Sequence, residues 1–258
     1  INGNRYFDDD TIRERLGIAP ASLLRYRHGR YSQSILEDDV NALTYLYRSN
    51  GFRDVQVTSR IENPFRGKTQ DVAVFIEIDE GEQWRVSELD LEGVSDEHRD
   101  RVSALLSSLP GQPYSEVNVA TDRDNVLDYD FNRGYLSASI EWSREEIPDT
   151  HQAKVRMVVE EGPQRFVRAT LIGGLQATDP DLVAGRFQLQ PGDPLSQSRM
   201  VQTQRRLYDL GIFARVDAAV QNPDGDEQSK YVLHQFEEAR RHSVNFGLGA
   251  QITRIGGG

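Results

Sequence analysis

The chain has 258 residues, of which 37% are hydrophobic, and carries a formal net charge of −11 with a pI near 5.0. This acidic balance excludes the basic footprint of a nucleic-acid-binding protein and disfavours adsorption to anionic lipid headgroups. The sequence contains no cysteine, which excludes disulfides, thiolate zinc sites and cysteine nucleophiles.

The first predicted unit covers residues 1–82. Carboxylates open a short helix, and a longer helix with apolar residues at helical spacing ends at Gly51. Ser34 and Glu37 match a capping box for the longer helix. Two strands then follow, joined by a turn at Asn63-Pro64: Val55–Ile61 and Val72–Ile78. The return strand is apolar on both faces, which predicts that it lies at the centre of a sheet.

The second predicted unit covers residues 83–163 and repeats this order. A strand from Trp84 to Glu92 comes first, and a helix closed by Pro110-Gly111 follows it. A second helix runs from Glu116 to Arg133. Alternating residues then predict two further strands, Leu136–Trp142 and Val155–Val159.

The third predicted unit covers residues 164–239. Its first strand includes Val167 to Leu171, and Thr178-Asp179-Pro180 opens its first helix. A second helix includes Val201 to Leu210. The unit ends with two strands joined by a turn, Val216–Val220 and Tyr231–Phe236.

Glycines mark the repetition. Gly51, Gly134 and Gly211 each follow a helix and precede a strand, at separations of 83 and 77 residues. Solenoid repeats are shorter, roughly 20–50 residues, so each period corresponds to a small domain. The sequence therefore predicts an α+β chain of three tandem modules, each strand–helix–helix–strand–strand, with a three-stranded sheet that carries two helices on one face.

Residues 240–258 leave this pattern. From His242 to Thr253, apolar residues alternate with small or polar ones. About 9–11 residues with this alternation cross a bilayer as one strand of a membrane barrel. A long strand of a soluble sheet is the alternative. Because the segment follows three tandem modules, we expect the start of a membrane β-barrel strand here.

The element order and the landmark glycines resemble the POTRA domain. The residues that carry this resemblance are Gly51-Phe52, Gly134-Tyr135, Gly211-Ile212-Phe213 and the strand-closing glycine of Ile1-Asn2-Gly3. Tandem modules followed by Arg240–Gly249 are similar to the periplasmic arm and first barrel strand of the outer-membrane barrel assembly and translocation family (BamA/TamA-like). The resemblance covers about residues 1–250.

The resemblance implies a non-enzymatic scaffold at the cell outer membrane, with this part of the chain in the periplasm. Its partners would be unfolded outer-membrane protein clients, periplasmic accessory proteins and the outer membrane itself, through a C-terminal barrel. Clients would bind by β-augmentation, in which an extended peptide completes the unpaired backbone groups of an edge strand.

If the second strand of each module lies at a sheet edge, ten positions become candidates for peptide binding. They are Val55, Val57, Ser59, Ile61, Leu136, Ala138, Ile140, Val216, Ala218 and Val220. We expect the side chains of Val57, Ile140 and Val216 to belong to the module cores, so that the backbone does the binding.

No catalytic or metal-binding pattern is evident. The five histidines are scattered without the spacing of a metal site. We therefore expect no enzymatic activity, no cofactor and no metal. Two other functions stay open: the POTRA arm of a two-partner secretion pore, and an array of α+β binding modules with no membrane link.

Overall fold

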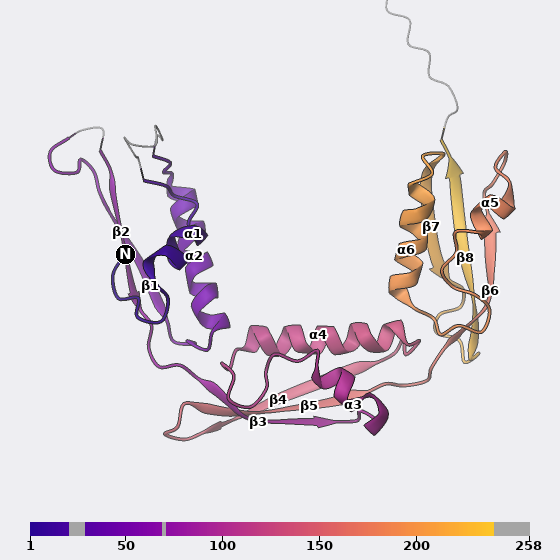
Figure 1. The fold of residues 1–258 in the computed structure, drawn as a ribbon, viewed down its shortest axis with the longest axis horizontal. Helices are drawn as coiled ribbons and strands as arrows, with labels where there is room; N and C mark the ends of the chain where they lie inside the picture. The colour runs from indigo at the N-terminus through magenta and orange to yellow at the C-terminus, as the bar shows by residue number, and fades with distance from the viewer. Residues whose placement is uncertain (21–28, 69–70, 240–258) are drawn as a thin grey trace, which may run out of the picture. The chain divides into compact units, whose positions relative to one another are not determined.

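The structure, a computed structural model, describes residues 1–20, 29–68 and 71–239. Its contacts divide the chain into two compact units: Ile1–Tyr129 with Ala138–Glu161, and Asp130–Ser137 with the residues from Gly162 on. Strands and helices follow one another in three α+β repeats (Figure 1). The strand predicted from His242 to Thr253 lies outside the described residues.

Repeat 1 ends with an antiparallel pair of strands. Its elements are α1 (Asp9–Arg15), α2 (Gln33–Ser49), β1 (Gln56–Glu62) and β2 (Ala73–Asp79). β1 pairs with β2, and Asn2 adds a parallel bridge to Glu77 of β2. This bridge lies on the side of β2 where the other repeats have their first strand.

Repeat 2 has a complete three-stranded sheet. Its elements are β3 (Arg85–Glu92), α3 (Asp96–Ser103), α4 (Glu116–Asn132), β4 (Ser139–Ile147) and β5 (Gln152–Glu160). The strand order is β3-β5-β4, with β3 parallel and β4 antiparallel to β5. In Figure 1, α4 lies along one face of this sheet.

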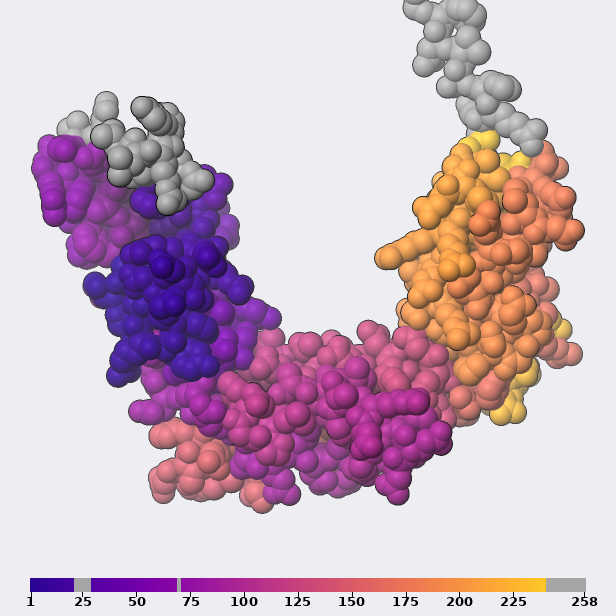
Figure 2. All heavy atoms as spheres, in the orientation of Figure 1, coloured from indigo at the N-terminus to yellow at the C-terminus, as the bar shows by residue number. Residues whose placement is uncertain are grey.

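Repeat 3 has the same topology. Its elements are β6 (Phe166–Gly173), α5 (Pro180–Ala184), α6 (Gln197–Tyr208), β7 (Phe213–Val220) and β8 (Ser229–Glu238). The strand order is β6-β8-β7, again with one parallel and one antiparallel pairing. Figure 2 shows repeat 3, coloured orange to yellow, as a compact body. β5 and β8 are therefore central in repeats 2 and 3. In repeat 1, β2 lies between β1 and the bridge at Asn2, as its two apolar faces predicted.

Buried apolar side chains form clusters that follow the repeats. Repeat 1 buries Tyr47 and Ile76, and repeat 2 has a cluster that includes Met157. Repeat 3 has two clusters, one around Leu207 and one around Leu195. Small separate cores of this kind suit a chain with a modest hydrophobic fraction. None of the helices in the described part of the chain has the length and hydropathy of a membrane-spanning segment.

A serine begins the second helix of repeats 1 and 3. The Ser32 hydroxyl accepts a hydrogen bond from Ile35 N at 3.1 Å, and the Ser196 hydroxyl accepts one from Arg199 N at 3.3 Å. The capping box predicted at Ser34 is therefore wrong, because Gln33 is already helical and Ser34 lies inside the first turn.

In each of the three repeats, a buried side chain of the second helix accepts hydrogen bonds from the loop that precedes this helix. Asp39 accepts hydrogen bonds from Gly17 N at 2.5 Å and Ile18 N at 2.9 Å. Its counterparts hold the corresponding loops. Asp122 accepts from Ser107 N and Ser108 N, both at 2.8 Å, and Thr203 accepts from Gln188 N at 3.0 Å. These acceptors satisfy amides that burial would otherwise leave without a partner.

Close backbone packing explains the glycine after each first strand. Gly3, Gly93 and Gly174 have φ angles of 88°, 81° and 84°, a left-handed region that L side chains rarely adopt. A Cβ atom on Gly93 would lie 1.9 Å from the carbonyl oxygen of Val159 on the central strand. At Gly3 and Gly174 the equivalent approaches are 2.0 and 2.1 Å. Only glycine allows the first strand to turn away at this point.

Two alanine substitutions separate the cost of the left-handed φ from the cost of the backbone clash. Gly111 also has a left-handed φ, 86°, but a Cβ there would meet nothing within 4 Å. We expect Gly111→Ala to lower the free energy of unfolding by about 1–2 kcal/mol through backbone strain alone. Gly93→Ala adds the clash and should cost about 3 kcal/mol or more. Equal losses for both variants in urea denaturation would contradict the close-packing account.

Candidate functional site: open sheet edges

The second strand of each repeat lies at the margin of its sheet. In the described ranges, β1, β4 and β7 each pair with one strand only, β2, β5 and β8 respectively. The other side of each strand has backbone amides and carbonyls available to a further strand. Which residues present those groups follows from the hydrogen bonds of the neighbouring central strand.

In repeat 1 the bridge at Asn2 fixes the phase of β1. Asn2 N donates to Ile76 O at 3.0 Å, and Ile78 N donates to Asn2 O at 2.9 Å. Ile76 and Ile78 therefore turn their backbone groups away from β1. Their partners in the register, Ser59 and Val57, turn theirs outward as well, because backbone groups alternate sides along a strand. Ile61 has the same phase.

In repeat 2 the parallel pairing fixes the phase of β4. Arg85 N donates to His151 O at 3.0 Å, so the odd-numbered residues of β5, such as Ala153, direct their backbone groups to β3. The β4 residues opposite them then direct theirs outward. These four residues are Ile140, Trp142, Arg144 and Glu146.

In repeat 3 the bond from Gln221 N to Tyr231 O, 2.8 Å long, fixes the phase of β7. Gln221 faces β8, so residues at odd distances from it along the strand face outward. They are Val216, Ala218 and Val220.

Seven of the predicted positions thus present their backbone outward: Val57, Ser59, Ile61, Ile140, Val216, Ala218 and Val220. Backbone groups and side chains both alternate with a period of two. Residues with outward backbone groups therefore share one face of the sheet for their side chains. On β7 this is the core face, since Val216 is completely buried. An incoming strand would meet backbone rather than these side chains.

Three predicted positions lie outside the strands. Val55 precedes β1 and is buried, so its side chain belongs to the core of repeat 1. Leu136 lies in a turn and packs against the cluster of Leu195, while Ala138 precedes β4. The prediction placed this strand three residues early because the alternation of small and apolar residues already begins in the turn.

Two outward positions of β4 lie beyond the predicted strand, which ended at Trp142. Arg144 and Glu146 extend the edge, and both are charged. Their charge hid the continuing alternation from an apolar pattern. These positions could have been found by continuing the two-residue alternation from Ile140 along the strand.

An ionic network supports the far end of the β4 edge. Arg53 donates to Glu146 at 2.6 Å, and its guanidinium lies 4.3 Å from the ring centre of Trp84. The hydrogen bond from Arg53 holds the pKa of Glu146 below its usual range. Arg144 bonds to the Tyr114 hydroxyl at 3.2 Å and pairs with Glu116. These contacts fix the side chains of the last outward residues.

Repeats 1 and 2 also meet through the backbone, within the first compact unit. Trp84 N donates to Gly51 O at 2.8 Å, and Gln83 Nε2 donates to Asn50 O at 2.9 Å. Asn118 Nδ2 donates to Ser49 O at 2.9 Å. The end of α2 is therefore hydrogen-bonded to both the start of β3 and the start of α4.

A buried histidine lies behind the β7 edge. His234 of β8 is opposite Ala218, is 3% exposed and stacks on Phe187 with ring centres 4.7 Å apart. Its Nδ1 has no hydrogen-bond partner among the residues described. Burial lowers the pKa of His234 to about 4, so the ring is neutral near pH 7.

Glu238 closes the same sheet. Its carboxylate accepts hydrogen bonds from the backbone amides of Ala177, Gln176 and Thr178 at 2.8–3.1 Å. These amides lower the pKa of Glu238 to about 2. Glu80 accepts from Arg5 N and Tyr6 N in the same way in repeat 1.

No metal-binding arrangement accompanies these edges. Across residues 1–20, 29–68 and 71–239, no group of three or more His, Cys, Asp or Glu side chains is placed to share a metal ion. The candidate site therefore consists of backbone amides and carbonyls on the free sides of β1, β4 and β7.

Comparison with known proteins identifies a repeat family. The family model of POTRA, described as "Surface antigen variable number repeat", matches residues 1–81, 84–162 and 166–238. Among solved structures, that of POTRA domains 3–5 of Haemophilus influenzae BamA superposes with a TM-score of 0.56 at 19% identity, covering 92% of this chain and 93% of that chain. BamA of Haemophilus ducreyi lacking POTRA domains 1–3 gives 0.53 at 18%, over 60% and 30%. These likenesses show a shared fold.

Curated relatives are longer proteins. The chain is 23% identical over 253 residues to a putative outer membrane protein assembly factor of Treponema pallidum, and 20% identical over 221 residues to the outer membrane protein assembly factor BamA of Neisseria meningitidis. The alignments cover 96% and 84% of this chain but 30% and 27% of the two relatives. The chain thus spans less than a third of their length.

The buried histidine predicts acid sensitivity of repeat 3. Its pKa is about 4 when folded and 6.5 in the reference state, so the unfolded chain binds the extra proton between these values. Stability should fall by about 2 kcal/mol through His234 as pH drops from 6.5 to 4.5, and the contribution of Glu238 is lost mainly below its ordinary pKa of 4.5. His234→Phe should flatten this part of the curve in urea denaturation followed against pH. An unchanged slope in the variant would contradict the assignment.

Proposed function

The chain belongs to the POTRA family, and we propose that it forms the periplasmic arm of an outer-membrane barrel assembly protein. In this role it receives unfolded outer-membrane proteins as extended segments. The similarity of nearly the whole chain to part of two outer membrane assembly factors supports the proposal. The arm acts by binding, without catalysis.

Outward backbone groups of the edge strands carry this proposal. β1 presents three residues outward and β4 presents four, each with one amide donor and one carbonyl acceptor. An extended client can pair with them as an additional strand of the sheet. Backbone pairing is insensitive to sequence, which suits a receptor that handles many different clients.

The same geometry predicts weak and reversible binding. Each hydrogen bond adds about 0.5–1.5 kcal/mol net, and association costs about 4 kcal/mol or more in lost freedom. Three or four paired residues make six to eight bonds, so at about 1 kcal/mol per bond about 2–4 kcal/mol remains and the Kd is in the millimolar range. Affinity in this range lets a client leave the arm for the next step of assembly.

Cross-linking with a backbone-blocking variant tests the proposal. A photoreactive residue at Thr58 of β1 or Ser143 of β4 should capture strand-forming peptides from unrelated outer-membrane proteins. Ser59→Pro removes an outward amide of β1 and leaves the pairing with β2 intact, since proline is tolerated on edge strands. We expect capture at Thr58 to fall about fivefold, the equivalent of one hydrogen bond.

Ser59→Ala is the matched control, because it removes the same hydroxyl and keeps the amide. Equal capture by the proline and alanine variants would contradict backbone pairing at β1. Absence of capture at both Thr58 and Ser143 would overturn the proposed function. Capture of one dedicated secreted protein alone would favour the arm of a two-partner secretion pore.

A further inference from the structure

The edge of β7 differs from those of β1 and β4 because a helix occupies part of it. Val216 is the first outward residue of β7. Its amide donates to the Tyr208 hydroxyl at 3.1 Å, and its carbonyl accepts a hydrogen bond from Gln204 Nε2. Both backbone groups of Val216 are therefore already paired within the repeat.

Gln204 and Tyr208 act from the same side of α6. They are four residues apart, so they lie on one face of the helix, toward β7. Tyr208 is 42% exposed and Gln204 is half-buried, so the pair stands where an added strand would have to lie. An incoming peptide would have to displace both side chains to reach Val216.

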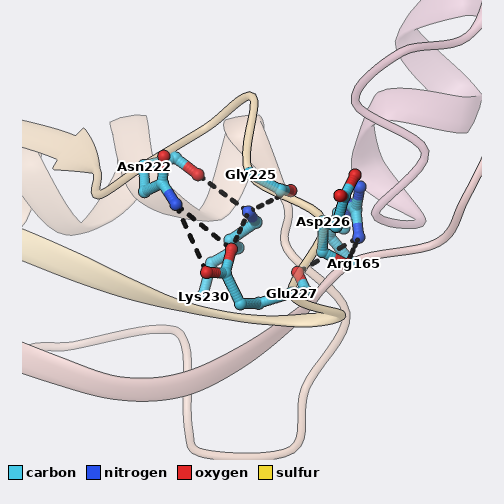
Figure 3. Close-up of polar contacts among 6 residues, drawn as sticks. All are labelled: Arg165, Asn222, Gly225, Asp226, Glu227 and Lys230. Carbon is cyan, nitrogen blue, oxygen red and sulfur yellow. Dashed lines mark hydrogen bonds and ion pairs between the residues drawn. The ribbon is translucent and has the colours of Figure 1, made fainter.

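The opposite end of the β7 edge is closed by a lysine. Lys230 is 2% exposed, and its ammonium donates to Asn222 O at 2.7 Å, to Gly225 O at 2.5 Å and to Glu227 at 3.2 Å. Figure 3 shows these acceptors surrounding the ammonium group in the turn after β7. The carbonyl of Asn222, in the turn that follows β7, is thereby occupied and is not available to an added strand.

An irregularity shortens the edge further. The register of β7 with β8 shifts between Phe213 and Arg215, so regular pairing begins only there. With Val216 occupied and the strand ending at Val220, two consecutive outward residues remain open, Ala218 and Val220. A two-residue edge offers too few bonds to hold an extended segment against the entropy of binding.

At the equivalent helix positions, repeats 1 and 2 have no pair of polar side chains bonded to the edge strand. Gln204 and Tyr208 are the eighth and twelfth residues after the N-cap Ser196. The equivalent positions hold one polar and one apolar residue in each case: Val40 and Thr44 in α2, and Arg123 and Leu127 in α4. The two polar ones are engaged locally, since Thr44 bonds to Val40 O at 2.8 Å and Arg123 bonds to Asp124 at 2.7 Å.

We propose that Gln204 and Tyr208 determine which repeats receive extended clients, by closing β7 and leaving β1 and β4 open. This inference rests on the proposed function, since it assigns the client site to repeats 1 and 2. The two side chains do not touch the client. They exclude it from repeat 3 by satisfying the backbone that it would otherwise pair with.

The test compares capture at β7 and β4 in the full chain. The probe is a fluorescent ten-residue peptide of alternating valine and threonine, and the photoreactive residue is placed at Ala219 of β7 or Ser143 of β4. We expect at least about fivefold less capture at Ala219 than at Ser143. The double variant Gln204→Met/Tyr208→Phe keeps side-chain size and removes both polar groups. It should raise capture at Ala219 about fivefold or more.

Two controls keep the outcome specific. Gln202→Met changes an exposed glutamine of α6 and should leave capture at Ala219 low. Ala218→Pro in the double variant removes an outward amide and should abolish the gain, which a merely loosened repeat would retain. If the double variant fails to fold, Tyr208→Phe alone gives a smaller increase.

Different results would contradict this inference and the proposed function. Capture at Ala219 of the unaltered chain equal to that at Ser143, or no gain in the double variant, would overturn this inference and leave the proposed function standing. Absence of capture at Ser143 and Thr58 would overturn the proposed function itself.

Discussion

Backbone hydrogen-bonding groups and side chains change sides along a β-strand with the same period of two residues. In an edge strand, the residues that offer backbone on the free side therefore all place their side chains on one face of the sheet. Val216 illustrates this coupling, since its side chain is completely buried and its amide and carbonyl point away from β8. In β7, the core and the pairing edge thus depend on the same alternate residues.

Repeats with the same topology can differ in how many backbone groups of the edge strand are available to an added strand. The glycine turn after the first strand and the buried acceptor on the second helix are shared, and they fix the sheet and the helix in place. What varies is the helix face beside the edge strand. Gln204 and Tyr208 pair with Val216 in repeat 3, whereas Leu127 of repeat 2 carries no polar group at all. In the proposal made above, these two side chains decide whether the edge is open or closed while the shared fold is kept.

Much of this organisation could be predicted from the sequence, because alternation and glycine placement are local signals. The order of elements follows from helical and strand periodicity, and the central position of β2 follows from its two apolar faces. The outward phase of Ser59 and Ile140 needed the hydrogen bonds of the central strands. Strand ends could not be predicted as well: Val55 and Leu136 continue the apolar alternation into turns. Contacts between elements carry no local signal. The closure of β7 by α6 and the burial of Lys230 depend on contacts between an element and its neighbour in the chain, and the neutral His234 depends on packing against Phe187, none of which periodicity reveals.

Amide hydrogen exchange measured by NMR, with and without an extended client peptide, tests the central claim most directly. If clients pair with outward backbone, the peptide should slow exchange at alternate residues: Val57 and Ser59 of β1, and Ile140 and Trp142 of β4. Thr58 and Glu141 already bond to the central strands and should change little. Protection spread evenly along these strands, or confined to residues away from the edges, would contradict the account.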